Sequence, residues 1–209
     1  MKDVIDILKK AEVIVSNSHF VGTSGRHMPT YINKDLLISN TKYASYIGKL
    51  FAEKFKNMRI EVVVAPAVAA IALSQWTAFY LSKIYKKEVL ALYTEKTADN
   101  NQIFKRGYDK MVKGRRVLLV EDVVTTGSSI KKVVRTVKRA GGRVIAASAI
   151  INRSPNNVDS VKLGFPFSAL CKYKIESYES SRCPLCKKGI PIDISLGHGN
   201  KYLNKSNHG

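Results

Sequence analysis

The sequence predicts an α/β protein with a mostly parallel, twisted sheet and helices on both faces. Short β-branched apolar runs alternate with segments of helical periodicity, and Pro or Gly residues mark several of the boundaries between them. Strands that alternate with helices of this length imply right-handed crossovers between parallel neighbours. The chain has 209 residues, which suits one domain with at most a small appendage.

The N-terminal part is expected to contain two helices separated by a loop. Residues 2–14 carry apolar side chains on one helical face, at Val4, Ile7, Leu8, Ala11 and Ile14. The stretch Ser16–Asn40 is rich in Ser, Thr, Gly, Asn and His, which predicts an irregular polar segment. Apolar residues at helical spacing then predict a second helix over Tyr43–Phe55.

The middle of the chain carries the alternating pattern. Strands are predicted at Ile60–Ala65, Glu88–Thr94, Val117–Glu121 and Arg143–Ile151, and helices at Ala67–Lys83 and from Ser128 to about Ala140, which Gly141 and Gly142 end. Glu95–Arg116 is polar and without apolar periodicity. The regularity weakens after Pro155, so we expect a domain over residues 1–182 and an irregular, cysteine-containing tail over residues 183–209.

Composition restricts the class of protein. The 35 Lys and Arg against 16 Asp and Glu give a net charge of +19, which fits a nucleic-acid binder, a protein with phosphate-rich substrates, or a basic proteome. No apolar run approaches the roughly 20 residues that span a bilayer, and the N-terminus lacks the pattern of a secretory signal. Three cysteines, an odd number, argue against a disulfide framework, so we expect a cytoplasmic protein.

The segment Val117–Ser129, VLLVEDVVTTGSS, predicts a site for a phosphorylated sugar. A strand ends in two acids, and a hydroxyl-rich turn leads into a helix N-terminus, where hydroxyls, N–H groups and the helix dipole favour an anion. Gly127 lets the backbone approach a phosphate closely. Glu121 and Asp122 would repel that phosphate, so they need ribose hydroxyls or Mg²⁺ as partners. The alternative is an N-capped helix preceded by solvated acids.

This segment resembles the 5-phosphoribosyl 1-pyrophosphate (PRPP) signature of the type I phosphoribosyltransferases. The resemblance implies that family's fold, with N-terminal hood elements within residues 1–40 that cover the sheet edge. It implies that Glu121 and Asp122 hold the ribose and act in catalysis. The PRPP site would comprise Glu121, Asp122, Val123, Val124, Thr125, Thr126, Gly127, Ser128 and Ser129, with Mg²⁺ bound mainly through PRPP near the two acids.

Two further segments resemble those of orotate phosphoribosyltransferases. His19–Lys34 resembles their N-terminal segment, which implies that Thr23–Arg26 lies near pyrophosphate and that Tyr31 and Ile32 lie near the base. Ser24, Arg26 and His27 are also polar enough, beside Gly25, to approach an anion. Arg153 follows the last predicted strand, and the resemblance implies that it pairs with a base carboxylate, with Thr125 nearby. A surface loop and a solvated arginine are the alternatives.

The basic segment Glu95–Arg116 resembles the mobile catalytic loop of the same enzymes. The resemblance implies that Lys96 reaches pyrophosphate, and it makes Lys105 and Arg106 further candidates for PRPP binding. A solvated loop is the alternative. The chain departs from the orotate pattern in having no charge from Pro66 to Ser74, and in having Thr97–Asn100 after Lys96.

The expected activity is therefore that of a Mg²⁺-dependent pentosyltransferase. It would move ribose 5-phosphate from PRPP to orotate and release pyrophosphate, in pyrimidine nucleotide synthesis, and the resemblance implies a homodimer. Two alternatives stay open, a purine or xanthine phosphoribosyltransferase of salvage and a PRPP-sensing regulator that binds nucleic acid.

The tail carries a Cys-x-x-Cys pair. A Zn²⁺ site can be drawn from Cys171, Cys183, Cys186 and His198, although a single such pair is a weak signal. Redox chemistry and unmetallated thiols are the alternatives.

Overall fold

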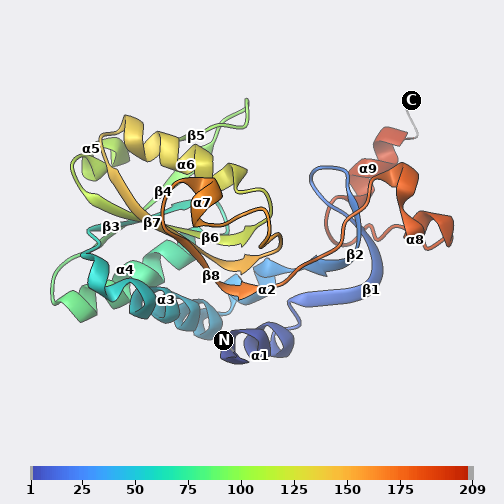
Figure 1. Cartoon of the computed structure of the whole chain (residues 1–209), viewed down its shortest axis with the longest axis horizontal. Coiled ribbons are helices and arrows are strands. Elements are labelled where there is room, and N and C mark those ends of the chain that lie inside the picture. The colour runs from blue at the N-terminus through green and yellow to red at the C-terminus, as the bar shows by residue number, and fades with distance from the viewer. Residues whose placement is uncertain (1, 207–209) are drawn as a thin grey trace.

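The computed structural model describes residues 2–206 and contains a six-stranded sheet covered by helices on both faces (Figure 1). The strand order is β5-β4-β3-β6-β7-β8, and all neighbours are parallel except β5, which runs antiparallel to β4. A separate antiparallel hairpin pairs β1 with β2. The predicted α/β class with a mostly parallel sheet is confirmed.

The elements have the following bounds. The strands are β1 (Ile14–Val21), β2 (His27–Ile32), β3 (Val62–Pro66), β4 (Leu90–Lys96), β5 (Gln102–Ile103), β6 (Arg116–Val124), β7 (Arg143–Asn152) and β8 (Phe167–Lys172). The α-helices are α1 (Lys2–Lys10), α2 (Lys34–Ser39), α3 (Thr41–Phe55), α4 (Ile71–Tyr85), α5 (Tyr108–Val112), α6 (Ser128–Arg139), α7 (Ser160–Leu163), α8 (Pro184–Lys187) and α9 (Gly199–Ser206). Single 3-10 turns occur at η1 (Lys56–Met58) and η2 (Ser180–Arg182).

Strand β3 shows how the two faces of the sheet are filled. All five of its residues are buried. Because side chains alternate along a strand, Val63 and Ala65 join the core formed with α1, α3 and α4, while Val62 and Val64 join the core formed with α5 and α6. A run that is apolar at every position therefore suits a central parallel strand.

The first helix and the polar segment after it differ from the prediction. Helix α1 ends at Lys10 and not at Ile14, because Glu12 adopts a positive φ of 51° and Ile14 begins a strand. The predicted irregular segment Ser16–Asn40 instead contains β1, β2 and α2. The hairpin is buried where its strands meet the turn, at His19–Val21 and at His27 and Met28, and its other residues are mostly half-buried or exposed. Because burial does not alternate along the strands, no period-two apolar pattern marks them in the sequence.

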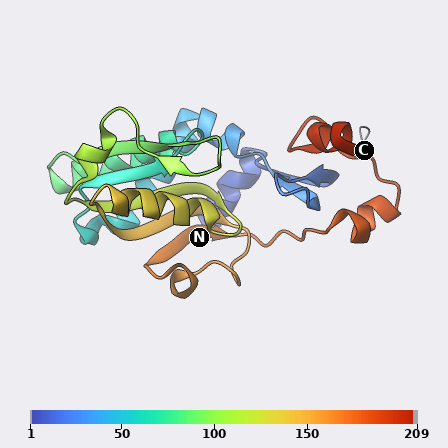
Figure 2. The same cartoon turned by 90° about the horizontal axis from the view of Figure 1, so that it is seen from above.

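The chain after β7 forms one more strand and then crosses to the hairpin. Strand β8 is the parallel edge strand beside β7. Its side chains are mostly half-buried, so its sequence has no strong apolar pattern from which the strand could be predicted. Figure 2 shows the following residues running away from the sheet, so that α8 and α9 lie beside β1 and β2. Tyr178 pairs with His27 in an isolated bridge. The last three residues of the predicted tail, 207–209, lie outside the described residues.

The segment that resembles a mobile loop is partly regular. It comprises the end of β4, a turn, β5 and α5, and the Thr136 hydroxyl on α6 donates to the Gln102 carbonyl at 2.5 Å. Its mobility stays a prediction. Within residues 2–206 we find no helix with the length and apolar character that crossing a membrane requires.

Candidate active site

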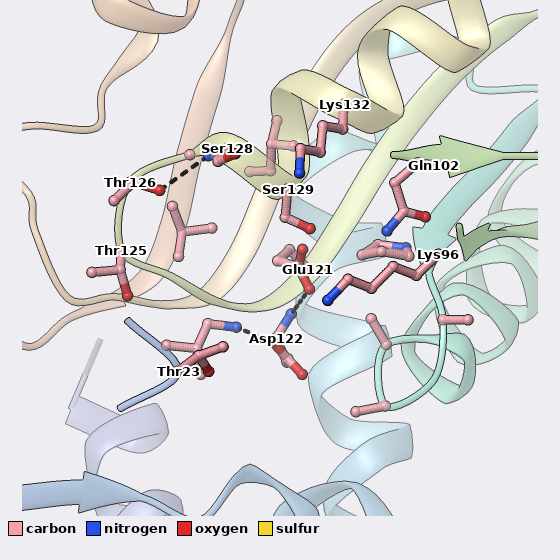
Figure 3. A pocket seen from close by; sticks show the side chains of 18 of the residues that line it. Thr23, Lys96, Gln102, Glu121, Asp122, Thr125, Thr126, Ser128, Ser129 and Lys132 are labelled. Carbon is pink, nitrogen blue, oxygen red and sulfur yellow. Dashed lines mark hydrogen bonds between the residues drawn. The ribbon is translucent and has the colours of Figure 1, made fainter. Parts of the chain in front are cut away.

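A cavity of about 530 Å³ opens at the carboxyl ends of β3, β4 and β6 (Figure 3). In parallel sheets, the loops that leave these ends meet and form ligand sites. Here the walls come from the loop after β3, from Lys96 at the end of β4, and from the whole segment Glu121–Ile130 between β6 and α6. The predicted PRPP residues from Glu121 to Ser129 thus line one cavity.

The turn into α6 is arranged to receive an anion. Gly127 has a φ of 72°, and it offers no side chain to cap the first turn of α6, whose N–H groups have no intrahelical partner. Thr126 accepts a hydrogen bond from the Ser128 N–H at 3.3 Å, which keeps its hydroxyl at the rim of the turn. A side chain at Gly127 would place its Cβ 3.1 Å from Leu163, so the turn is also closely packed from behind.

The acid pair at the end of β6 is buried. Glu121 and Asp122 are each 6% exposed. Burial, and then the charge of Asp122, raises the pKa of Glu121 to about 8. The Asp122 carboxylate accepts a backbone hydrogen bond from Val123, and the Glu121 carboxylate accepts one from Asp122 at 3.1 Å. Two adjacent buried acids that line the cavity suit a ligand that offers hydroxyl donors.

Lys34 is the counter-ion of this pair, and sequence reasoning did not assign it a role. Its Nζ lies 2.8 Å from Asp122 Oδ2, although Lys34 is the first residue of α2 and is distant from Asp122 in the sequence. Burial by itself would lower the pKa of the Lys34 ammonium, but the charge and hydrogen bond of Asp122 outweigh burial, so the pKa is raised. The only feature of the sequence that could have indicated this role is that Lys34 follows shortly after Tyr31 and Ile32.

Two more lysines reach the same cavity. Figure 3 shows Lys96 and Lys132 extending toward the space in front of Glu121 and Ser129. Lys132 was not predicted, but it lies four residues after Ser128 and therefore on the same face of α6. The two further candidates of the basic segment, Lys105 and Arg106, do not line the cavity, because both pair with Glu95 at an exposed position.

A smaller cavity of about 210 Å³ adjoins the first. It contains all four predicted base-binding residues, and it shares part of its wall with the larger cavity. The predicted residues are Thr125, Arg153, Tyr31 and Ile32. The shared wall comprises Thr23, Lys34, Asp122, Val123 and Thr125. His198 from the tail also lines the smaller cavity, at 3.1 Å from the Thr23 hydroxyl, and the sequence did not predict this contact.

Arg153 lines the smaller cavity together with Lys34, but it has no carboxylate partner in the described part of the chain, whereas Lys34 is paired with Asp122. Burial lowers the pKa of the Arg153 guanidinium. Its Nη2 contacts Met28 Sδ at 3.2 Å, and its Nε is buried without a hydrogen-bond partner among residues 2–206. No carboxylate of the described chain lies within ion-pair distance of it. A half-buried guanidinium with a buried Nε and no carboxylate beside it is suited to an anionic partner from outside the protein.

The turn Thr23–Arg26 faces the cavities at one end and contacts the tail at the other. Thr23 lines both cavities, as the pyrophosphate expectation requires. Arg26 instead donates to the Ser177 carbonyl at 2.6 Å and pairs with Glu179, and His27 is fully buried against His19. Neither side chain faces the active-site cavities, because the tail crosses the hairpin at this point.

The four zinc ligands drawn from the sequence are not brought together as a set. Cys171 lies in β8, where it pairs with Ile151 and packs into the sheet core, and His198 contacts Thr23. Cys183 and Cys186 remain side by side next to two histidines of the hairpin. The cause is that β8 belongs to the sheet, whereas the two later cysteines follow the crossing to the hairpin.

The fold and the two joined cavities define a class of protein that holds a phosphorylated sugar beside a small anionic acceptor. The phosphoribosyl transferase domain family matches residues 37–164. The orotate phosphoribosyltransferase of Caldanaerobacter subterraneus subsp. tengcongensis is 40% identical over 189 residues, which cover 90% of this chain and 93% of that protein. That of Thermotoga maritima is 35% identical over 197 residues, which cover 94% of this chain and 98% of that protein.

The crystal structure of orotate phosphoribosyltransferase from Aeropyrum pernix has a TM-score of 0.63 at 22% identity, covering 81% of this chain and 93% of the other. The chain therefore belongs to the type I phosphoribosyltransferase family, and within it to the orotate-type members.

Proposed function

We propose that this protein transfers ribose 5-phosphate from PRPP to orotate, giving orotidine 5′-phosphate and pyrophosphate in pyrimidine nucleotide synthesis. The observation that carries the proposal is the half-buried guanidinium of Arg153, which has no carboxylate partner among residues 2–206 and lies in a cavity that shares a wall with the ribose-phosphate cavity. Orotate is a small planar base with a carboxylate, which is the partner that such a guanidinium lacks. The curated relatives that match most of the chain carry the same activity in their names.

The chemistry divides among the walls of the cavities. Glu121 and Asp122 accept hydrogen bonds from the ribose hydroxyls, and the turn Thr125–Ser129 holds the 5-phosphate. The bond from the anomeric carbon to pyrophosphate breaks, and its electron pair leaves with pyrophosphate. The base nitrogen forms the new bond to that carbon, and its proton passes to water. The Asp122 carboxylate, joined by Glu121 when that group has lost its proton, favours the positive charge that develops on the sugar, and Lys96 and Lys132 neutralise the leaving pyrophosphate.

The proposal includes Mg²⁺, and the donor set fits that ion. Mg²⁺ keeps several waters and binds through one or two carboxylates together with substrate phosphates. Among residues 2–206, Glu121 and Asp122 are the only carboxylates that line the larger cavity. The Lys34 ammonium already pairs with Asp122. PRPP oxygens would therefore hold the ion for the most part, with Glu121 and Asp122 beside them, and the ion would neutralise charge on pyrophosphate. Protein exchanged by gel filtration into a buffer without Mg²⁺ and without chelator should release no pyrophosphate, and activity should return on titration with Mg²⁺.

The proposal also includes a homodimer and a cytoplasmic location. The family resemblance implies the dimer, and the three cysteines without disulfide partners fit a reducing compartment. Light scattering of the purified protein measures the first, and fractionation of cells measures the second.

The test is an assay of pyrophosphate release from PRPP with a panel of acceptors. Orotate should support release, while uracil, adenine, hypoxanthine and xanthine should support little. Asp122→Asn should abolish most of the turnover, and Asp109→Asn, an exposed acid on α5, is the matched control that should retain it. Release with a purine and not with orotate would reassign the acceptor. PRPP binding without release from any base, together with salt-sensitive nucleic-acid binding, would favour a regulator.

A further inference from the structure

Four potential metal ligands converge at the hairpin, outside both cavities. His19 comes from β1, His27 from β2, and Cys183 and Cys186 from the start of α8. Their ligand atoms all lie within 4.8 Å of one another. None of the four lines the active-site cavities.

The distances are close to those of a tetrahedral zinc centre. Zinc bonds of about 2.3 Å to sulfur and about 2.05 Å to nitrogen give tetrahedral edges of about 3.5 Å between N and S and about 3.3 Å between two N atoms. Here Cys186 Sγ lies 3.4 Å from His27 Nδ1, and Cys183 Sγ lies 3.7 Å from His19 Nε2. The distance from Cys186 Sγ to His19 Nε2 is 3.9 Å. The two ring nitrogens, 2.7 Å apart, need to separate by roughly 0.6 Å for metal to enter.

The surroundings of the histidines favour a ligand role. His19 Nδ1 lies 2.7 Å from the Ile190 carbonyl, so it carries the proton and leaves the lone pair of Nε2 directed at the cluster. A backbone carbonyl on the second nitrogen is the usual support of a zinc-bound histidine. His27 has no such partner: its Nε2 is buried without a hydrogen bond among the described residues, so this support is present for His19 alone, and His27 is placed by the proximity of its Nδ1 to Cys186 Sγ.

The burial of the cluster adds a second argument. His19, His27 and Cys183 are each at most 1% exposed, and the polar atoms they present point chiefly at one another. Buried polar groups in native proteins are paired, and one cation would satisfy all four ligand atoms together. Cys186 is exposed, which leaves a path from solvent to the centre.

We propose that His19, His27, Cys183 and Cys186 bind one structural Zn²⁺ ion. Four protein ligands complete the tetrahedron and leave no open position for substrate, so the ion holds segments together and takes no part in the reaction. It joins the hairpin to a segment 164 residues later in the chain. The same crossing is held by Arg26 with Ser177 and by Thr23 with His198.

The ion thereby has a consequence at the acceptor cavity, which rests on the proposed function. His198 lines that cavity from the tail, and Thr23, Met28 and Tyr31 line it from the hairpin. Loss of the ion frees the tail from the hairpin, so the wall of the acceptor cavity loses its support. We expect the KM for orotate to rise by about tenfold and the KM for PRPP to change less, because PRPP is held mainly by the sheet.

The metal test does not depend on enzyme activity. The full chain, purified without a metal-binding tag, should contain about one zinc per chain by elemental analysis. Cys183→Ser and Cys186→Ser should lose it, and Cys171→Ser, a buried cysteine of the sheet, is the matched control that should retain it. Co²⁺ in place of zinc should give the visible absorption of a tetrahedral centre and a thiolate-to-cobalt charge-transfer band.

A measurement on the unaltered chain covers the case in which the variants do not fold. Alkylation mapped by mass spectrometry should leave Cys183 and Cys186 unmodified until a chelator is added. Rapid alkylation of Cys186 in the native chain, or a reduced and folded chain that takes up neither Zn²⁺ nor Co²⁺, would overturn the site. One zinc per chain in a protein that releases no pyrophosphate would instead retain the site and remove the proposed function.

Discussion

The ion pair between Lys34 and Asp122 provides the sharpest test of the active-site geometry. Lys34→Met removes the counter-ion of a carboxylate whose side chain is only 8% exposed. At 2.8 Å and an effective dielectric constant of about 20, the Coulomb attraction is about 6 kcal/mol. Most of it is offset by the desolvation of both groups, and Lys34 itself is 36% exposed. We expect a net coupling of about 1–3 kcal/mol between the two side chains.

A double-mutant cycle measures that coupling. Lys34→Met, Asp122→Asn and the double variant are unfolded in urea, and the non-additive part of the free energy of unfolding is the coupling. The pair between Lys56 and Glu53, each 48% exposed, is the matched control, with an expected coupling of about 0.3–0.5 kcal/mol. A coupling at the active site no larger than that of the control would refute the inference that Lys34 is the counter-ion of the acid pair.

Three further predictions concern the pKa of Glu121, the guanidinium of Arg153 and the packing around Gly48. Because burial raises the pKa of Glu121 to about 8, above the 4.5 of a free carboxyl, the folded protein keeps a proton that the unfolded chain has lost, and this contribution to stability is lost as the pH rises to about 8. Glu121→Gln should therefore flatten the decline of thermal stability over that range while it lowers turnover, and an unchanged slope would contradict the shift. Arg153→Met should lower kcat/KM for orotate by about ten- to a hundredfold in steady-state assays, with a smaller effect on the KM for PRPP, because a charge-assisted bond contributes about 1.5–3 kcal/mol. Gly48→Ala should destabilise the protein by about 1–3 kcal/mol in urea unfolding, because its Cβ would lie 2.4 Å from Trp76 Cβ, whereas Lys49→Ala on the exposed face should have little effect.

The sequence by itself determined the four central strands of the sheet, β4, β3, β6 and β7, and the phosphate turn. Central parallel strands are nearly continuous apolar runs, so segments such as 60–65 and 143–151 are visible without knowledge of their neighbours. The acids, the hydroxyls and Gly127 are adjacent along the chain, and one strand, one turn and one helix suffice to place them together. Arg153 could be predicted for a related reason, since it follows a strand parallel to β6 and so emerges at the same edge of the sheet.

Only the tertiary structure decided which distant residues meet. Lys34 approaches Asp122 because α2 begins beside the carboxyl end of β6, and no local pattern encodes that contact. The hairpin escaped prediction because its two strands bury few apolar side chains and depend on the tail for much of their packing. His19 and His27 were read as parts of a polar segment, yet they lie against Cys183 and Cys186. Spacing along a chain reports contacts within one strand or helix, whereas contacts between segments depend on how the whole chain packs, and the structure was needed to find them.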